Sequence, residues 1–139
     1  MVPDIIDGIS IKLNDIYDVP IYGDEDIKQG FKQPCFFIAV LNPSQETRLY
    51  GRYIRRNPFD VHYFPKSRID AENVASELYE ALEHITLIDG TLLRGTEISH
   101  DVQDGVLHFF VSYNVMLTKD LIPPDSEMDG VIVQTGIGE

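Results

Sequence analysis

The chain has 139 residues, the length of a single domain, and 43% of them are hydrophobic, enough to bury a core. The net charge of −12 argues against a general DNA- or RNA-binding protein, which needs a basic surface. No apolar run approaches the roughly 20 residues that span a bilayer, and the single cysteine, Cys35, excludes an internal disulfide framework and a multi-cysteine zinc site.

The N-terminal segment predicts a helix over residues 3–17. Its first ten residues lack the basic flank and apolar block of a signal peptide, so we expect a cytoplasmic protein. Pro3 suits the first helical turn, and Asp4 favours the positive end of the helix dipole. An apolar stripe follows at helical spacing: Ile5, Ile6, Ile9, Leu13 and Ile16. A short strand at Val19–Tyr22 and a loop come next.

Three strands are predicted in the next third of the chain. Cys35–Leu41 is continuously apolar, which is typical of a strand covered on both faces, and we expect Cys35 to be a buried, inert thiol. Gln45–Arg56 is rich in Thr, Tyr and Arg and predicts a second strand. Asn57-Pro58 interrupts it, because proline cannot donate to a strand ladder. The third strand places Phe59, Val61 and Tyr63 on one face and Asp60 and His62 on the other.

The second half predicts a helix and two strands. Asp70 is the expected N-cap. The buried stripe of the helix follows: Val74, Ala75, Leu78, Leu82 and Ile85. After a turn at Asp89-Gly90, strands at 91–100 and Val106–Leu117 are joined by a hairpin at Asp104-Gly105. In the last strand the odd positions are core-like, whereas His108, Ser112 and Asn114 face water or a partner.

Together these elements predict an α+β fold: a mainly antiparallel β-sheet packed by two α-helices, in the order α-β-β-β-α-β-β. We assign residues 1–119 to this domain. Residues 120–139 form an acidic C-terminal segment with two open interpretations. One is a disordered tail. The other is an arm, containing Val131–Val133, that adds a strand to a neighbouring subunit's sheet.

Charge is unevenly distributed. Six of the eleven basic residues lie between Arg48 and Arg68, whereas the first 27 residues carry seven acids. Strand alternation would place Arg48, Tyr50, Arg52 and Arg56 on one face and Tyr53 and Arg55 on the other. Three interpretations remain open for this surface: an interface that forms salt bridges between subunits, a solvated face, and a nucleic-acid platform with stacking aromatics.

The sequence contains no catalytic, cofactor-binding or metal-ligand motif, so we expect no enzyme activity and no cofactor. The four histidines have no zinc-ligand spacing. His100 with Asp101 and Asp104 is better explained by turn formation than by metal binding. Asp60 and His62 share a strand face and could touch, but a catalytic pair would also need a nucleophile or a cleft, which the sequence does not indicate.

Five segments within residues 4–118 are distinctive: DIIDGISIKLN, GFKQPCFFIAVLNPSQ, NPFDVHYFPKS, DGTLLRG and DGVLHFFVSYNV. Together they resemble the small tail-terminator (tail-completion) proteins of phages and prophages of Gram-positive bacteria. The resemblance implies a small fold with a sheet flanked by helices and a homohexameric ring on the head-proximal end of the tail. Such a ring stops polymerisation of the tail tube, and of the sheath where there is one, and joins the tail to the head-completion or connector protein.

The resemblance also implies that DNA passes through the lumen of the ring without specific binding, which an acidic lumen would favour. Assembly in the host cytoplasm and a final place in the virion follow from it, and no membrane is involved. The alternatives are a head-completion or connector protein, or a small nucleic-acid-binding module that uses the strand from Arg48 to Arg56.

Overall fold

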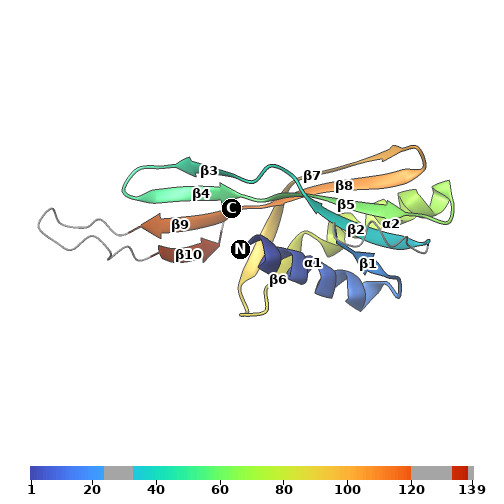
Figure 1. Ribbon diagram of the computed structural model, residues 1–139, viewed down its shortest axis with the longest axis horizontal. Helices are drawn as coiled ribbons and strands as arrows, with labels where there is room; N and C mark the ends of the chain where they lie inside the picture. Colours follow the sequence, from blue (N-terminus) through green and yellow to red (C-terminus); the bar gives the residue numbers. More distant parts are fainter. Residues whose placement is uncertain (24–32, 120–132, 138–139) are drawn as a thin grey trace, which may run out of the picture.

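The computed structural model describes residues 1–23, 33–119 and 133–137 of the chain (Figure 1). The helices are α1 (Val2–Ile16) and α2 (Arg68–Ala81). The strands are β1 (Ile21–Tyr22), β2 (Cys35–Val40), β3 (Ser44–Thr47), β4 (Arg52–Arg56), β5 (Pro58–Phe64), β6 (His84–Thr86), β7 (Leu92–Gln103), β8 (Val106–Tyr113), β9 (Val115–Lys119) and β10 (Val133–Ile137). Neither helix is long and apolar enough, within these ranges, to cross a membrane.

The main sheet has six strands in the order β1-β2-β5-β8-β7-β6. Only β1 and β2 run parallel in it, and all other neighbours are antiparallel. Side chains from α1 and α2 join those of the sheet in one hydrophobic core. The prediction of an α+β fold with a mainly antiparallel sheet and two helices is therefore confirmed. The predicted order of the long elements also holds, with short strands added to it.

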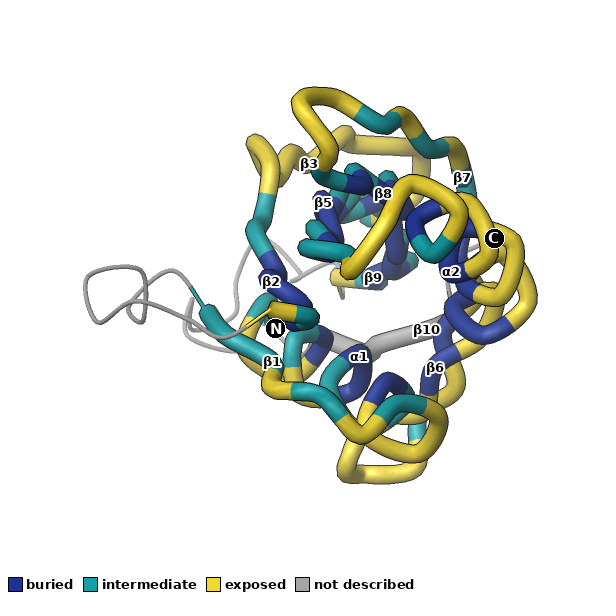
Figure 2. Tube along the Cα trace, turned by 90° about the vertical axis from the view of Figure 1, so that its right-hand side faces the viewer, coloured by how far each residue is buried: buried dark blue, intermediate teal, exposed yellow. Residues whose placement is uncertain are grey.

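The core follows the alternation predicted for the last strand, except at Ser112, which was expected to face water or a partner and is only 2% exposed. All of its odd positions from Leu107 to Leu117 are buried, and in Figure 2 the buried parts of β2, β5 and β8 lie toward the inside. The ring of Tyr113 is fully buried, and its hydroxyl donates a hydrogen bond of 2.6 Å to the carbonyl oxygen of Leu82. The strand itself is divided, because Asn114 separates β8 from β9.

Helix α1 matches the prediction within one residue. Its buried positions include Ile5, Ile9 and Leu13, but the placement of Ile16 in the stripe was wrong: it ends the helix and is 47% exposed. Gly8 disfavours a helix in isolation. The packing explains its presence, because a Cβ at Gly8 would lie only 3.3 Å from side chains at the β6 end of the sheet.

The N-cap of helix α2 lies three residues before the predicted one, Asp70. Ser67 is the N-cap, and its hydroxyl accepts a hydrogen bond from the Asp70 N–H. Asp70 instead accepts a 2.7 Å hydrogen bond from the Tyr63 hydroxyl. The predicted assignment of Ile85 to the helix was also wrong. Ile85 instead lies in β6 and is buried in the core. This strand has only three residues, too few to show alternation in the sequence.

A second sheet of four strands has the order β10-β9-β4-β3 and projects beyond the helices (Figure 1). It is continuous with the main sheet, because β4 leads into β5 at Asn57 and β8 leads into β9 at Asn114. Asn57 is fully buried. Its Nδ2 donates to the Tyr113 carbonyl and its own carbonyl accepts from the Tyr113 N–H, both at 3.0 Å. The predicted break at Asn57-Pro58 is thus confirmed.

The C-terminal segment contributes a strand to this second sheet. Val133–Ile137 forms β10, which runs antiparallel to β9 of the same chain and pairs Val133 with Lys119. The rest of the predicted tail or arm, residues 120–132 and 138–139, lies outside the described residues, as does most of the predicted loop after β1.

Candidate functional site

The arginine-rich segment is a β-hairpin, and its prediction as one strand from Gln45 to Arg56 was wrong. Strands β3 and β4 pair antiparallel and are joined by a tight turn at Tyr50-Gly51. Both turn residues have positive φ, 61° and 72°, which is the geometry of a type I′ turn. Asn-Gly is the usual sequence signal for this turn, so a tyrosine at its first central position concealed it.

The hairpin still separates the arginines as the alternation predicted. Arg48 and Arg56 both reach Glu46, which fixes them on one face, and Arg52 lies on that face by its position in β4. Tyr53 and Arg55 belong to the other face, opposite Leu117 and Val115 of β9. Tyr50 belongs to neither face, contrary to the prediction, because it occupies the turn.

Most of the cluster finds partners within its own hairpin. The Nε of Arg48 and the Nη1 of Arg56 lie 3.0 and 3.1 Å from the carboxylate of Glu46. The Nη2 of Arg55 donates a 2.7 Å hydrogen bond to the side-chain oxygen of Gln45. These exposed interactions contribute at most about 1 kcal/mol each. Arg52 is exposed and forms no side-chain ion pair or hydrogen bond with any described residue.

The tip of the hairpin presents two apolar side chains that sequence reasoning did not single out together. Leu49 is 77% exposed and Tyr50 is 83% exposed. A shallow hollow of about 350 Å³ beside them is lined by Arg48, Leu49, Tyr50, Arg52 and Met116. Tyr and Arg are enriched among the residues that dominate protein–protein binding energies. The hairpin tip therefore has the composition of a contact surface.

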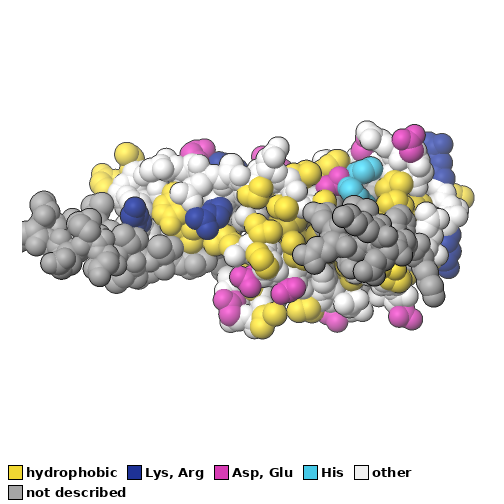
Figure 3. Space-filling model, viewed as in Figure 1, with side chains coloured by type: hydrophobic (Ala, Val, Ile, Leu, Met, Phe, Trp, Pro, Cys, Tyr) yellow, Lys and Arg dark blue, Asp and Glu magenta, His cyan; other side chains and the backbone are white. Residues whose placement is uncertain are grey.

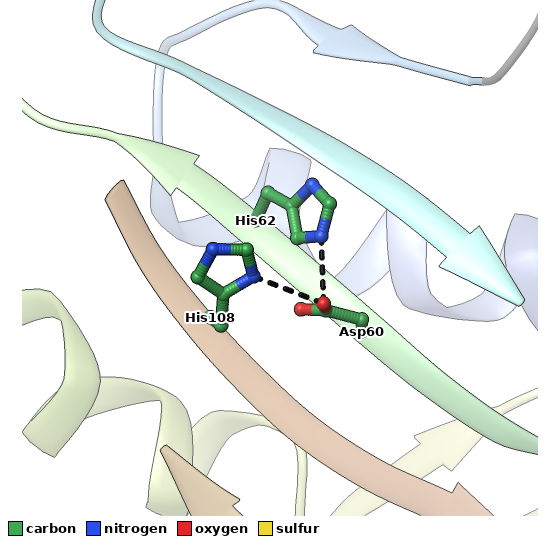
Figure 4. Close-up of side chains that lie close together, drawn as sticks. All are labelled: Asp60, His62 and His108. Atoms are coloured by element: carbon green, nitrogen blue, oxygen red, sulfur yellow. Dashed lines mark hydrogen bonds and ion pairs between the residues drawn. The ribbon is translucent and has the colours of Figure 1, made fainter. Parts of the chain in front are cut away.

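A second cluster lies on the face of the main sheet that points away from the helices. Asp60 and His62 come from β5, and His108 comes from the neighbouring strand β8, directly opposite His62 (Figure 4). His62 Nε2 and His108 Nδ1 lie 2.7 and 3.0 Å from the same carboxylate oxygen, Oδ2 of Asp60. The predicted contact of Asp60 with His62 is confirmed. The sequence did not indicate that His108 is the third member of this cluster, because that requires knowing that β8 lies next to β5 in the sheet.

The other candidate residues of the sequence have structural surroundings. His100 contacts Tyr79 and Glu72 of α2, while Asp101 accepts a hydrogen bond from Gln103. They do not converge on a metal corner with Asp104, whose φ of 51° belongs to the hairpin turn. Cys35 is fully buried, and burial raises the pKa of its thiol. The predicted burial of Cys35 is therefore confirmed, and a raised thiol pKa disfavours the reactive thiolate.

Comparison with known proteins places these features in a family. No curated protein matches the chain. The family model described as phage tail terminator protein matches residues 4–125. This range contains all of α1 except its first two residues, and the whole of α2, the main sheet and the arginine-rich hairpin. The chain belongs to this family of phage tail terminator proteins, and is therefore a structural protein of tail assembly and a component of the virion.

Proposed function

We propose that copies of this chain form a ring, homohexameric as the resemblance implies, on the head-proximal end of a phage tail. The ring ends polymerisation of the tail tube, and of the sheath where there is one. Its other side joins the tail to a head-completion or connector protein. Assembly takes place in the cytoplasm of the host, a Gram-positive bacterium, and the protein has no enzymatic role.

The conformation and exposure of the tyrosine at the tip of the hairpin are the main support for a contact between subunits there. Tyr50 has a left-handed backbone, which is unfavourable for residues other than Gly, Asn and Asp. Its ring is 83% exposed, so packing within the chain does not compensate this cost. Strained residues of this kind cluster at functional sites, where the strain serves the function. A partner that buries the ring of Tyr50 would account for both features.

The projecting four-stranded sheet supports a contact between unlike surfaces of two copies. A closed ring needs such heterologous contacts, in which one surface of each subunit meets a different surface of the next. The hairpin offers a basic and apolar tip. Helix α2 and the residues just after it offer an acidic surface, formed by Glu72, Glu77, Glu80 and Glu83, all exposed. Charge complementarity between the two would fix the orientation of neighbouring subunits.

The partners of the arginines favour protein contacts over nucleic acid. Glu46 forms ion pairs with two of the arginines, and Gln45 accepts a hydrogen bond from a third. Among the described residues, Arg52 is therefore the one arginine of this hairpin whose guanidinium has no partner. Binding along a phosphate backbone uses several free cations. We propose that DNA passes through the lumen of the ring without being held by this hairpin.

A pair of matched variants tests the ring contact. Leu49→Ser removes an apolar side chain that is 77% exposed at the hairpin tip, and Ile88→Ser removes one that is 76% exposed between β6 and β7. We expect Leu49→Ser to shift sedimentation of the purified protein from rings to monomers at concentrations where Ile88→Ser still forms rings. If both variants assemble like the original chain, the tip is not a contact. DNA retention by the isolated chain at low salt would instead favour the nucleic-acid module.

A further inference from the structure

We infer that Asp60, His62 and His108 form a binding site for a divalent transition-metal ion of the zinc type. Each residue offers one ligand atom, and the three atoms lie within 4.8 Å of one another. Figure 4 shows the two imidazole rings turned toward the same carboxylate from adjacent strands. This inference is independent of the proposed ring, because it rests on the outer face of the main sheet and not on the hairpin.

The carboxylate is the first reason. Asp60 is only 7% exposed, and its Oδ1 is buried without a hydrogen-bond partner among the described residues. Buried polar atoms are nearly always satisfied, so an orphaned carboxylate oxygen requires an explanation. A cation bound between the carboxylate and the two rings would compensate the buried negative charge, which both carboxylate oxygens share.

The rigidity of the site is the second reason. His62 and His108 are directly opposite each other in the β5–β8 ladder, so their Cα positions are fixed by the sheet. Each ring also stacks on a phenylalanine of the same face: His62 on Phe37 at a centroid distance of 6.2 Å, and His108 on Phe110 at 6.3 Å. Metal sites on such rigid elements lose little freedom when the ion binds.

The dimensions and the ligand types favour zinc-like ions. Zinc bonds of about 2.0–2.1 Å in tetrahedral geometry place ligand atoms about 3.3 Å apart. The present distances of 2.7 and 3.0 Å to Asp60 Oδ2 would need only small side-chain rotations to reach this spacing. Two imidazoles and one carboxylate suit Zn²⁺, Co²⁺ or Ni²⁺, whereas Mg²⁺ and Ca²⁺ prefer oxygen ligands alone.

The site is open to solvent. The side chains of His62 and His108 are each 24% exposed, and histidine side chains are visible at the surface in Figure 3. An ion can therefore reach the site from solvent. Three protein ligands leave a fourth position open to water or to a ligand atom of another molecule.

The test is a titration of the full chain with Co²⁺, whose visible absorption reports tetrahedral coordination, followed by competition with Zn²⁺. We expect one ion per chain and a tetrahedral spectrum that Zn²⁺ abolishes. His108→Gln and Asp60→Asn should each weaken binding by at least about tenfold. His100→Gln is the matched control, because His100 also pairs with a carboxylate but at a separate place, and it should bind like the original chain.

The measurement on the original chain can overturn the inference whether or not a variant folds. Absence of stoichiometric Co²⁺ and Zn²⁺ binding to it would overturn the inference. So would a spectrum without tetrahedral bands, or equal affinity of the original chain and a folded His108→Gln variant. Loss of binding in His100→Gln alone would place the ion elsewhere and would overturn it as well.

Discussion

Replacing Tyr50 by asparagine should make the isolated chain more stable and the assembled ring weaker. The substitution converts Tyr-Gly into Asn-Gly, the pair preferred in type I′ turns. A left-handed backbone costs an ordinary residue roughly 1–2 kcal/mol and costs asparagine less. Because the tyrosine ring is 83% exposed, its removal loses little packing. We therefore expect the free energy of unfolding of the monomer to rise by about 0.5–1 kcal/mol.

The effect on assembly should be larger and of opposite sign. A tyrosine buries on the order of 200 Å² when it is fully covered. With 83% of its surface free in the monomer, a neighbour could cover about 165 Å², worth about 4 kcal/mol at ~25 cal/mol per Å². Truncation of a dominant interface aromatic costs about 2 kcal/mol or more. We expect a loss of about 2–4 kcal/mol per contact, which is a roughly 30- to 700-fold weaker association.

Two measurements separate these effects. Urea unfolding followed by circular dichroism, at concentrations too low for assembly, gives the stability of the monomer. Sedimentation velocity over a concentration series gives the association. Ile88→Asn is the control for adding an exposed asparagine, and should leave association unchanged. A lower urea midpoint for Tyr50→Asn would refute the backbone argument, and unchanged association would refute the assignment of the hairpin tip as the contact.

Three further substitutions test other parts of the account. Tyr113→Phe leaves a buried carbonyl without its 2.6 Å hydrogen bond and should lower the free energy of unfolding by about 2 kcal/mol. The control, Tyr79→Phe, removes an exposed hydrogen bond and should lower it by less than about 0.5 kcal/mol. Equal urea midpoints for the two variants would contradict this. Gly95→Ala should cost about 1–3 kcal/mol, because its Cβ would lie 2.8 Å from a backbone carbonyl oxygen and from a core methyl group; an unchanged melting temperature would speak against such tight packing. Arg52→Ser should weaken ring formation more than Arg55→Ser does, since Arg55 already bonds to its own hairpin; the reverse order in sedimentation would contradict the assignment.

The long elements were predictable because their patterns are strong. The stripe of α1 and the six alternating positions from Leu107 to Leu117 depend only on the period of each structure, and burial dominates their energetics. The hairpin was not predictable by the same rules. Tyr50 adopts a conformation that its residue type disfavours, so the turn signal was weak where the proposed function requires an aromatic tip.

The Asp60 cluster shows a second limit of the sequence. Alternation placed Asp60 and His62 on one face, and it placed His108 on the outer side of its own strand. Nothing local relates these strands, which are 46 residues apart between the two histidines (108 − 62). Their adjacency is a property of the sheet order β5-β8, which depends on the packing of the whole domain.

The most direct test of the central proposal is the length of phage tails made without this protein. The gene would be deleted from the phage, and the particles measured by electron microscopy, with the original gene or the Tyr50→Asn variant supplied in trans. We predict tails of irregular length that do not join heads, restored by the original gene and restored poorly by the variant. Tails of normal, uniform length that join heads without the protein would contradict the account.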